Sequence, residues 1–439
     1  MTVPVLIFAF FFVILVGAPI AIALGGSAVF TSTFFSPIAP GIVGQKLFGN
    51  LNHFTLMAIP FFFLAAGLME RGGLVQRLVG LAQAMVGHLR AGLGMTTVLT
   101  CIFFAAISGS SPATVAAVGN ILYPSLMKEG YSPKYAIGAL ATSGSIGILI
   151  PPSIPLILYG FVTETSIPAL FMAGLLPGLL YGALLLLTAR ILAVREGVKV
   201  QPKATGQQLR KALRVSLPAL SLPVFIVLGI YGFPEFTLFG WHSKGGAIFT
   251  PTEAAAVSAV LAMVIGFFIY RELTVRQLIQ ITAETGPRVG MIFWITANAL
   301  LFGYFLTKVG VPAAMAQLVV DMNLSPIVFL LCVNILLVIV GFFLEGVPTI
   351  LIFAPLLVPA AQNLGIDPVH FAIIMVVNIE LGLITPPVGI NLFVASSISG
   401  MPVLKVFQAT LPWMIATIVT LLIVTYFPPL SMFLPGLMQ

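Results

Sequence analysis

The stretch GILIPPS at residues 147–153 returns as GLITPPV at residues 382–388, and each copy lies inside a long apolar segment. A proline cannot give the backbone hydrogen bond that a helix needs, so each Pro-Pro pair frees two carbonyls four residues upstream. The residue before each pair, Ile150 or Thr385, is also pushed out of helical geometry. The sequence therefore predicts two apolar helices that are interrupted near their middle.

These copies belong to a longer internal repeat. Matching landmarks recur 235 residues apart: Pro124 with Pro359, Gly130 with Gly365, and Pro133 with Pro368. One matched proline would mean little in a chain with 32 prolines, but several at one offset indicate two related halves. We predict halves at 1–193 and 216–439, joined by a linker at 194–215, with interrupted helices at about 132–161 and 368–398.

The composition places most of the chain in lipid. Hydrophobic residues make up 59% and charged residues only 7%, whereas a soluble protein carries about 25% charged residues. This excludes a soluble enzyme and a nucleic-acid binder. Uninterrupted stretches long enough to cross the hydrocarbon lie at roughly 4–34, 54–70, 168–193, 216–232, 251–270, 289–307 and 406–434. Residues 4–34 are long for one helix and short for two, and Pro19 could break them.

The basic residues report orientation. The segment from Arg190 to Arg214 is the richest in Lys and Arg and holds one acid, Glu196. Basic residues concentrate on the cytoplasmic side of membrane proteins. We therefore place the linker in the cytoplasm. If the apolar segments on either side of it cross the membrane in alternating directions, most of the 19 Lys and Arg fall on the cytoplasmic side as well.

Two further segments, at about 92–128 and 325–363, are too long for one crossing and too short for two. Their centres, SGSSP at 108–112 and EGVPT at 345–349, make poor helix interiors. We interpret both as re-entrant hairpins with polar tips, which are tolerated only where protein or a water-filled cavity surrounds them. The threading gives the two hairpins opposite orientations. The predicted fold is thus an all-α polytopic membrane protein with an inverted-topology repeat.

A helix along the membrane surface is expected before each hairpin, at 74–90 and 308–323. The polar residues of the first segment fall largely on one face, which is typical of an interfacial helix.

The freed carbonyls and the polar tips predict ion binding. The carbonyls belong to Gly147, Ile148, Gly382 and Leu383, and the tip hydroxyls to Ser108, Ser110, Ser111 and Thr349. Hard cations take oxygen ligands of this kind, and unwound helices hold Na⁺ in many transporters. The alternative is that each Pro-Pro pair is only a kink whose carbonyls are capped by neighbouring hydroxyls. We favour ion binding because two such sets recur in register.

Helix N-termini at the tips and after each Pro-Pro pair suit a small anionic substrate. Four polar residues there are the candidate substrate ligands: Ser110, Thr114, Ser153 and Asn391. No Lys or Arg lies in these central segments. Two deep acids, Glu345 and Glu380, are either functional groups or structural hydrogen-bond partners, and the sequence leaves this open.

Four motifs together resemble one known family: LVGAPIA at 15–21, SGSSPAT at 108–114, GILIPPS at 147–153 and NIELGLITPPVGINL at 378–392. The chain resembles, over essentially its whole length, the large membrane subunit of tripartite ATP-independent periplasmic (TRAP) transporters. The resemblance implies an elevator-type, Na⁺-driven importer of carboxylates in the bacterial inner membrane. It also implies a small four-helix membrane subunit and a periplasmic substrate-binding protein as partners.

By the same resemblance, two Na⁺ sites are expected. The first would use Ser108, Ser111, Gly147, Ile150 and Pro152, and the second Thr349, Gly382, Thr385 and Pro387. The substrate stays open among C4-dicarboxylates, sialic acid and other sugar or keto acids.

Three other classes were weighed. A stand-alone Na⁺/carboxylate symporter of the same superfamily would share the repeat and is the principal alternative. An ABC permease does not fit two re-entrant hairpins. An intramembrane enzyme would need a nucleophile with a base, a carboxylate pair or a metal triad, and we find none of these, so we expect no enzymatic activity.

Overall fold

The computed structural model describes residues 2–35, 41–197, 202–232, 236–238, 241–243 and 248–437. Among these residues, seven helices are long and apolar enough to cross a bilayer. Two three-residue strands, β1 (Phe236–Leu238) and β2 (Trp241–Ser243), pair antiparallel. The prediction of an all-α polytopic protein is confirmed apart from this short β-hairpin, which no sequence signal indicated.

The two halves present the same order of elements. The first half contains α4 (Ala58–Arg71), α5 (Leu74–Val86), α6 (Gly92–Ser108), α7 (Ser111–Lys128), α8 (Pro133–Ser143), η2 (Gly144–Ile148), α9 (Ile154–Thr163) and α10 (Ile167–Glu196). The second half contains α13 (Val275–Lys308), α14 (Val311–Asp321), α15 (Pro326–Gly341), α16 (Gly346–Asn363), α17 (Pro368–Leu383), α18 (Ile390–Ser399) and α19 (Val403–Tyr426). Both predicted hairpins (α6–α7 and α15–α16) and both interrupted helices (α8–α9 and α17–α18) are present.

The other elements flank these two series. They are α1 (Thr2–Leu15), α2 (Ile20–Phe35), α3 (Gly41–Leu51), η1 (Phe54–Met57), α11 (Gly206–Tyr231), α12 (Pro251–Val264), η3 (Ile265–Ile269) and α20 (Pro429–Gly436). Helix α3 was not predicted.

A polar cap followed by proline starts several of these helices. The side chains of Ser132, Ser325 and Asp367 each accept a hydrogen bond from a backbone N–H in the first turn of α8, α15 and α17. Each of these caps precedes a proline, whose missing N–H costs nothing at the first helical position. The start of each interrupted helix is thus determined locally.

The structure also corrects several predicted boundaries. Residues 4–34 form two helices, because Gly17 adopts a φ of 88° and Pro19 follows it. The predicted span 406–434 ends at Tyr426, since Pro428 cannot continue the helix. Helices α10 and α11 extend into the predicted linker, of which residues 198–201 lie outside the described part of the chain. The division into domains stays a prediction.

The largest boundary error concerns α13. This helix starts at Val275 rather than near residue 289, behind a capping box formed by Thr274 and Gln277. Its first turns contain charged residues and Pro287, so they fall outside any window of high hydropathy. The apolar pattern therefore detected only the second part of a 34-residue helix.

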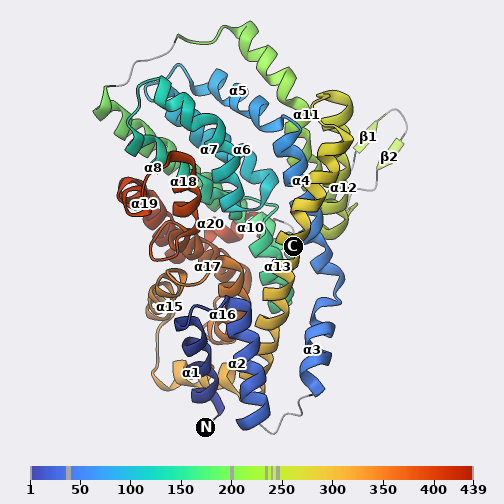
Figure 1. Ribbon diagram of the computed structural model, residues 1–439, viewed down its shortest axis with the longest axis vertical. Helices are drawn as coiled ribbons and strands as arrows, with labels where there is room; N and C mark the ends of the chain where they lie inside the picture. The colour runs from blue at the N-terminus through green and yellow to red at the C-terminus, as the bar shows by residue number, and fades with distance from the viewer. Residues whose placement is uncertain are drawn as a thin grey trace.

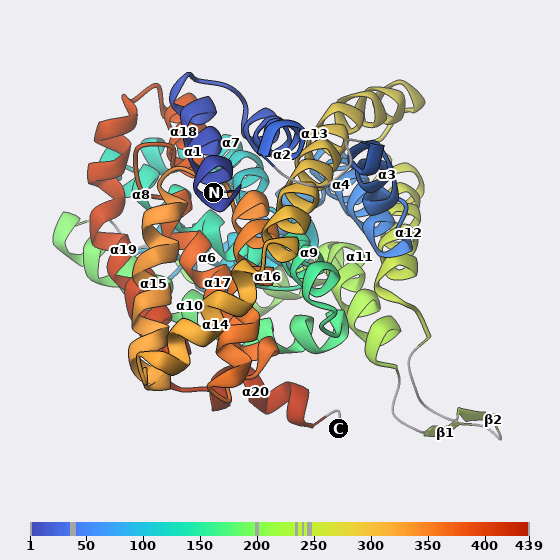
Figure 2. The same cartoon turned by 90° about the horizontal axis from the view of Figure 1, so that it is seen from below.

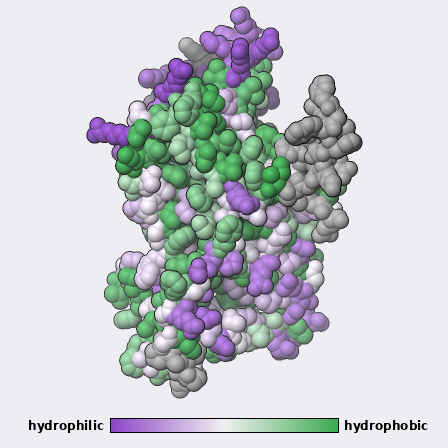
Figure 3. Space-filling view, turned by 90° about the vertical axis from the view of Figure 1, so that its right-hand side faces the viewer, coloured by the Kyte–Doolittle hydropathy of each residue, from purple (hydrophilic) through white to green (hydrophobic). Residues whose placement is uncertain are grey.

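The helices form two groups. Figures 1 and 2 both place α3, α11 and α12 on one side of the molecule and α8, α18 and α19 on the other. In the first group, which we call the scaffold helices (α2, α3, α4, α11, α12 and α13), α12 packs on α4, and α13 packs on α2, α3 and α4. In the second group the two halves interlock, with α8 against α19, α7 against α18 and α9 against α16. Figure 3 shows a broad hydrophobic area on the scaffold side, with hydrophilic residues at its upper end.

The two segments predicted to lie along the membrane surface are helical, as α5 and α14. Helix α5 packs on α6 and α11. The Arg77 guanidinium on α5 pairs with Glu272 at 2.5 Å and lies 4.1 Å from the centre of the Tyr270 ring. The backbone carbonyl of Arg77 accepts a hydrogen bond from the Ser216 hydroxyl. These contacts anchor α5 to the scaffold helices directly before the first hairpin.

Candidate functional site

Each hairpin tip is bound to the break in the interrupted helix of its own half. In the first half, the Ile154 amide donates to the Gly109 carbonyl at 3.4 Å, and in the second the Val388 amide donates to the Phe342 carbonyl at 3.1 Å. Gly109 has a φ of 59°, and a Cβ there would lie 2.6 Å from the Pro152 carbonyl oxygen. Only glycine allows this approach, so the tip and the break form one local unit.

The first predicted Na⁺ site is closed and built from neutral oxygens. All five predicted ligand residues are buried: Ser108, Ser111, Gly147, Ile150 and Pro152. Among the loop and cap hydrogen bonds of the described residues, none is accepted by the carbonyls of Gly147, Ile150 or Pro152. Buried carbonyls without donors are costly in lipid, and a hard cation accepts such oxygens. The donor set therefore fits Na⁺.

Two of the four predicted freed carbonyls have protein partners. The Gly382 carbonyl accepts from the Thr385 amide at 3.1 Å, and the Ile148 carbonyl is the other. The Ser153 hydroxyl donates to the Ile148 carbonyl at 2.5 Å and accepts from the Leu156 amide at 3.4 Å. For Ile148 the kink interpretation holds, because a neighbouring hydroxyl caps the carbonyl. The Ser153 side chain is buried and engaged at the start of α9.

The second predicted Na⁺ site is more open. Thr349 is buried, whereas Thr385 is half-buried and Pro387 exposed. The Thr349 hydroxyl donates to the Glu345 carbonyl at 2.7 Å, and the Thr385 hydroxyl donates to the Leu381 carbonyl at 2.6 Å. Both hydroxyl oxygens keep lone pairs for a cation, and this donor set also fits Na⁺.

A glycine pair lies beside this second site. A Cβ on Gly382 would come within 2.9 Å of the Gly341 Cα and carbonyl oxygen. The first helix of the hairpin therefore runs in backbone contact with the end of α17. The absence of both side chains lets the two backbones approach this closely.

The four predicted substrate residues occupy different places. Ser110 lines a cavity between the tips. The Thr114 hydroxyl is buried and bonded to the Ser108 hydroxyl at 2.8 Å. Asn391, also buried, donates to the hydroxyls of Ser111 (2.7 Å) and Ser145 (3.1 Å). Thr114, Ser153 and Asn391 thus serve internal packing here, and their predicted contact with substrate stays a prediction.

The Asn391 contacts join the two halves of the repeat. Asn391 belongs to α18, whereas Ser111 begins α7 and Ser145 lies in η2. The amide also donates to the Ala141 carbonyl at 3.3 Å. One side chain from the second half therefore holds three groups around the first predicted Na⁺ site, which the sequence alone did not indicate.

The deep acid Glu380 is fully buried, and neither carboxylate oxygen meets hydrogen-bond geometry with a described residue. The Ser145 hydroxyl and the Ile148 amide lie beside it. Asn378 instead donates to the Asn334 side chain at 2.8 Å.

A cavity of about 260 Å³ lies between the two hairpin tips and the scaffold. Its wall includes Gly109 to Pro112 from the first tip and Glu345 to Val347 from the second. Arg288 on α13 also lines it. The sequence motifs predict no cationic side chain at the centre, because Arg288 lies on a different helix far from the tips in the chain.

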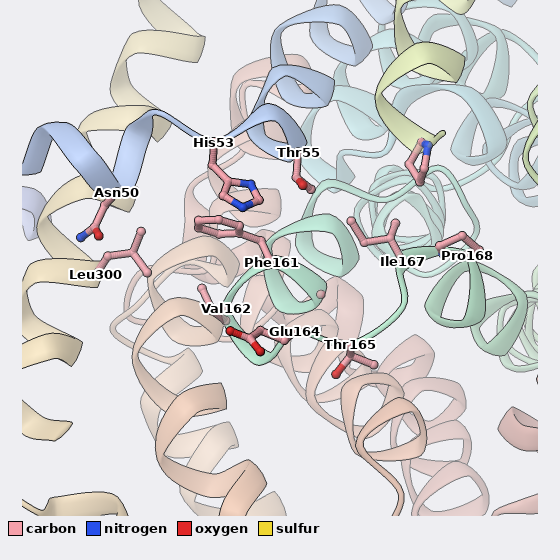
Figure 4. Close-up of a pocket in the computed structure, with 12 residues that line it drawn as sticks. Asn50, His53, Thr55, Phe161, Val162, Glu164, Thr165, Ile167, Pro168 and Leu300 are labelled. Carbon is pink, nitrogen blue, oxygen red and sulfur yellow. The ribbon is translucent and has the colours of Figure 1, made fainter. Parts of the chain in front are cut away.

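A larger cavity of about 610 Å³ lies where α3 and η1 meet the α9–α10 connection. In Figure 4 the His53 ring stands over the Phe161 ring, with Glu164 and Thr165 on the connection below and Leu300 on α13. The two ring centres are 4.8 Å apart. This cavity contains none of the predicted site residues.

Two hairpins that meet two interrupted helices around a central cavity, in a chain with seven apolar helices of spanning length, define a secondary transporter built from inverted repeats. The chain belongs to the family described as tripartite ATP-independent periplasmic transporter, DctM component, whose model matches residues 7–430. The resemblance stated from the motifs is thereby confirmed.

Similar proteins cover nearly the whole chain. The C4-dicarboxylate TRAP transporter large permease protein DctM of Pseudomonas aeruginosa is 44% identical over 94% of each chain. The sialic acid TRAP transporter large permease protein SiaM of Vibrio cholerae is 32% identical over 98% of each. The isethionate TRAP transporter permease protein DctMQ of Oleidesulfovibrio alaskensis is 38% identical over 99% of this chain and 66% of its own length.

The fold is shared with more distant membrane proteins. The YdaH transporter of Alcanivorax borkumensis superposes with a TM-score of 0.62 at 16% identity, over 98% of this chain and 97% of its own. MtrF of Neisseria gonorrhoeae superposes with a TM-score of 0.62 at 12% identity, over 98% of this chain and 95% of its own. At such identities the likeness concerns the fold alone.

Proposed function

We propose that this chain is the Na⁺-driven permease subunit that imports a small carboxylate across the bacterial inner membrane. The carboxylate would be delivered by a periplasmic binding protein, and a small four-helix membrane subunit would complete the permease. Relatives named for C4-dicarboxylates and sialic acid support a carboxylate substrate. The relative named DctMQ, of which this chain covers 66%, supports a second membrane component.

The observation that carries Na⁺ coupling is the first oxygen cluster. Ser108 and Ser111 supply hydroxyls from the hairpin tip. The break between η2 and α9 supplies the carbonyls of Ile150 and Pro152, which accept no loop or cap hydrogen bond from the described residues. A bound Na⁺ supplies positive charge beside the cavity that Ser110 and Ser111 line. An anionic substrate and the cation then stabilise one another, which couples their binding.

The chain's own residues form the rest of this arrangement. The tip hydroxyls and freed carbonyls hold the cation, the N-terminus of α7 faces the cavity, and Asn391 fixes Ser111 in place. The interlocked hairpins and interrupted helices would move as one body past the scaffold helices, as in an elevator. Helices α5 and α14 would connect the fixed and moving parts.

The test of Na⁺ coupling is uptake by the reconstituted permease with its binding protein. Uptake in Na⁺ should exceed uptake in K⁺ or choline at equal ionic strength, and equal uptake in all three salts would contradict the proposal. Thr385→Ala removes one neutral ligand, so the Na⁺ concentration for half-maximal uptake should rise about fivefold, from a contact of roughly 1 kcal/mol. Thr282→Ala is the matched control, because Thr282 makes the same i−4 hydroxyl bond on an exposed face of α13.

The principal alternative, a stand-alone Na⁺/carboxylate symporter, makes the opposite prediction about partners. In liposomes that contain only this chain, the proposed permease subunit should transport poorly. Robust Na⁺-dependent uptake by the single chain would favour the symporter.

A further inference from the structure

The central cavity contains an acid but needs to admit an anion. Glu345 lines the cavity from the second tip, and much of the remaining wall is apolar, including Phe63, Met291 and Ile292. A carboxylate entering this space would meet a like charge at low dielectric, which disfavours binding. A positive group in the wall would offset this repulsion, in addition to any bound cation.

Arg288 is the cationic side chain in the described wall of this cavity. Its guanidinium forms no ion pair within 4 Å with a described acid. The nearest acid on its own helix, Glu284, is held instead by Arg71, whose Nη2 donates to both carboxylate oxygens at 2.7 and 2.8 Å. Glu70 and Glu284 both lie close enough to interact electrostatically with Arg288, and neither pairs with it. Arg288 is exposed and lines the cavity, and no described acid forms an ion pair with its guanidinium.

We propose that Arg288 binds a carboxylate of the transported molecule and is a specificity-determining residue of this permease. This inference rests on the proposed function and names the chemistry of substrate recognition. The planar guanidinium matches a carboxylate with two parallel hydrogen bonds, which a lysine cannot reproduce. At about 260 Å³ the cavity suits a small organic acid rather than a drug-sized ligand.

The second end of such a molecule has a separate place in the cavity. Ser110 and Ser111 line it at the start of α7, an 18-residue helix whose N-terminus carries partial positive charge. A substrate would therefore have one carboxylate on Arg288 of the scaffold and a polar or acidic group at the first tip. The two ends of the substrate would then be held by the two groups of helices.

The experiment measures uptake by the complete permease, reconstituted with its small subunit and binding protein. The probes are succinate, N-acetylneuraminate and isethionate. For succinate and N-acetylneuraminate, which carry carboxylates, Arg288→Gln should raise KM at least tenfold with a smaller change in Vmax, since a charge-assisted pair is worth about 1.5–3 kcal/mol. Isethionate is a sulfonate and serves as the anion without a carboxylate. Arg288→Lys should fall between wild type and Arg288→Gln. Arg276→Gln, which removes an exposed arginine from the same helix outside the cavity wall, should stay within twofold.

A competition assay separates substrate contact from a structural role. With succinate as the transported probe, wild type should lose affinity when the competitor changes from succinate to succinamate, and Arg288→Gln should lose much less. An unchanged KM for every transported probe, or an equal amide penalty in both proteins, would overturn the role of Arg288. Wild-type protein that transports none of the three anions would count against the proposed function instead.

Discussion

Adding one methyl group to Gly382 should damage the second ion site, whereas adding it to Gly341 should not. In Gly382→Ala the new Cβ would lie 2.9 Å from the Cα and the carbonyl oxygen of Gly341 and 3.0 Å from its carbonyl carbon. Ordinary contact begins near 3.4 Å, so the hairpin must move by about 0.5 Å. Such overpacking costs roughly 1–3 kcal/mol, which exceeds the 0.5–1 kcal/mol that alanine gains over glycine in a helix.

Gly341→Ala is the matched control from the other side of the same contact. Its Cβ would meet the Gly382 Cα at 3.2 Å and the Gly382 nitrogen only at 3.9 Å. A shift of a few tenths of an ångström relieves this contact. The substitution should therefore change stability by less than about 1 kcal/mol, because the helix gain offsets the residual strain.

The assay is thermal unfolding of the purified chain with increasing Na⁺. Wild type and Gly341→Ala should gain melting temperature as Na⁺ rises, by the linkage of binding to folding. Gly382→Ala should start lower and gain less, because its displaced carbonyl belongs to the predicted ligand set. If Gly382→Ala responds to Na⁺ like wild type, this reading of the glycine contact is wrong.

Three further results are expected. Asn391→Ala should destabilise the chain by roughly 2–3 kcal/mol, because the buried acceptors of its amide lose their donor; unchanged thermal unfolding would remove Asn391 as the link between the halves. Glu284→Gln should change unfolding by less than about 1 kcal/mol, because its pair with Arg71 is well exposed to solvent; a much larger loss in a melt would contradict this. A cysteine pair placed across the packed helices α13 and α16, in a background lacking Cys101 and Cys332, should stop uptake when crosslinked and restore it when reduced. Full uptake in a completely crosslinked sample would show that the hairpin does not travel.

The repeat could be predicted because its signals are local. Pro-Pro pairs, polar tips and cap-plus-proline starts act within one turn of helix, so their positions in the chain translate directly into helix ends. The same logic failed for α13, where charged residues and Pro287 lie inside one continuous helix. Tertiary packing against α2, α3 and α4 accompanies that continuity, and no local pattern reports it.

The site was predicted in part for a related reason. The predicted ligands of each proposed Na⁺ site come from a tip and a break in one half, so the repeat itself brings these residues together. The contact of Asn391 with Ser111 joins opposite halves, and Arg288 approaches the cavity from the scaffold. Both contacts depend on how helices that are distant in the sequence pack together. A single sequence without an alignment contains no pattern that predicts such packing.

The two halves differ in stiffness at one matching place. Helix α13 runs unbroken for 34 residues, or about 51 Å. At the repeat offset of 235 residues its counterpart is 40–73, within which α3 ends at Leu51 and η1 begins at Phe54. One half therefore contains a single continuous helix, and the other an arm of two helical segments that is interrupted between Leu51 and Phe54. The larger cavity lies at this interruption, beside His53. In an inverted repeat, the inward-open and outward-open conformations differ in which half adopts which shape. The two conformations would be equally populated only if both arms bent with the same free-energy cost. If the two arms bend unequally, one conformation is favoured before any ligand binds, and each 1.4 kcal/mol of that bias is a factor of about ten that bound ligands need to overcome.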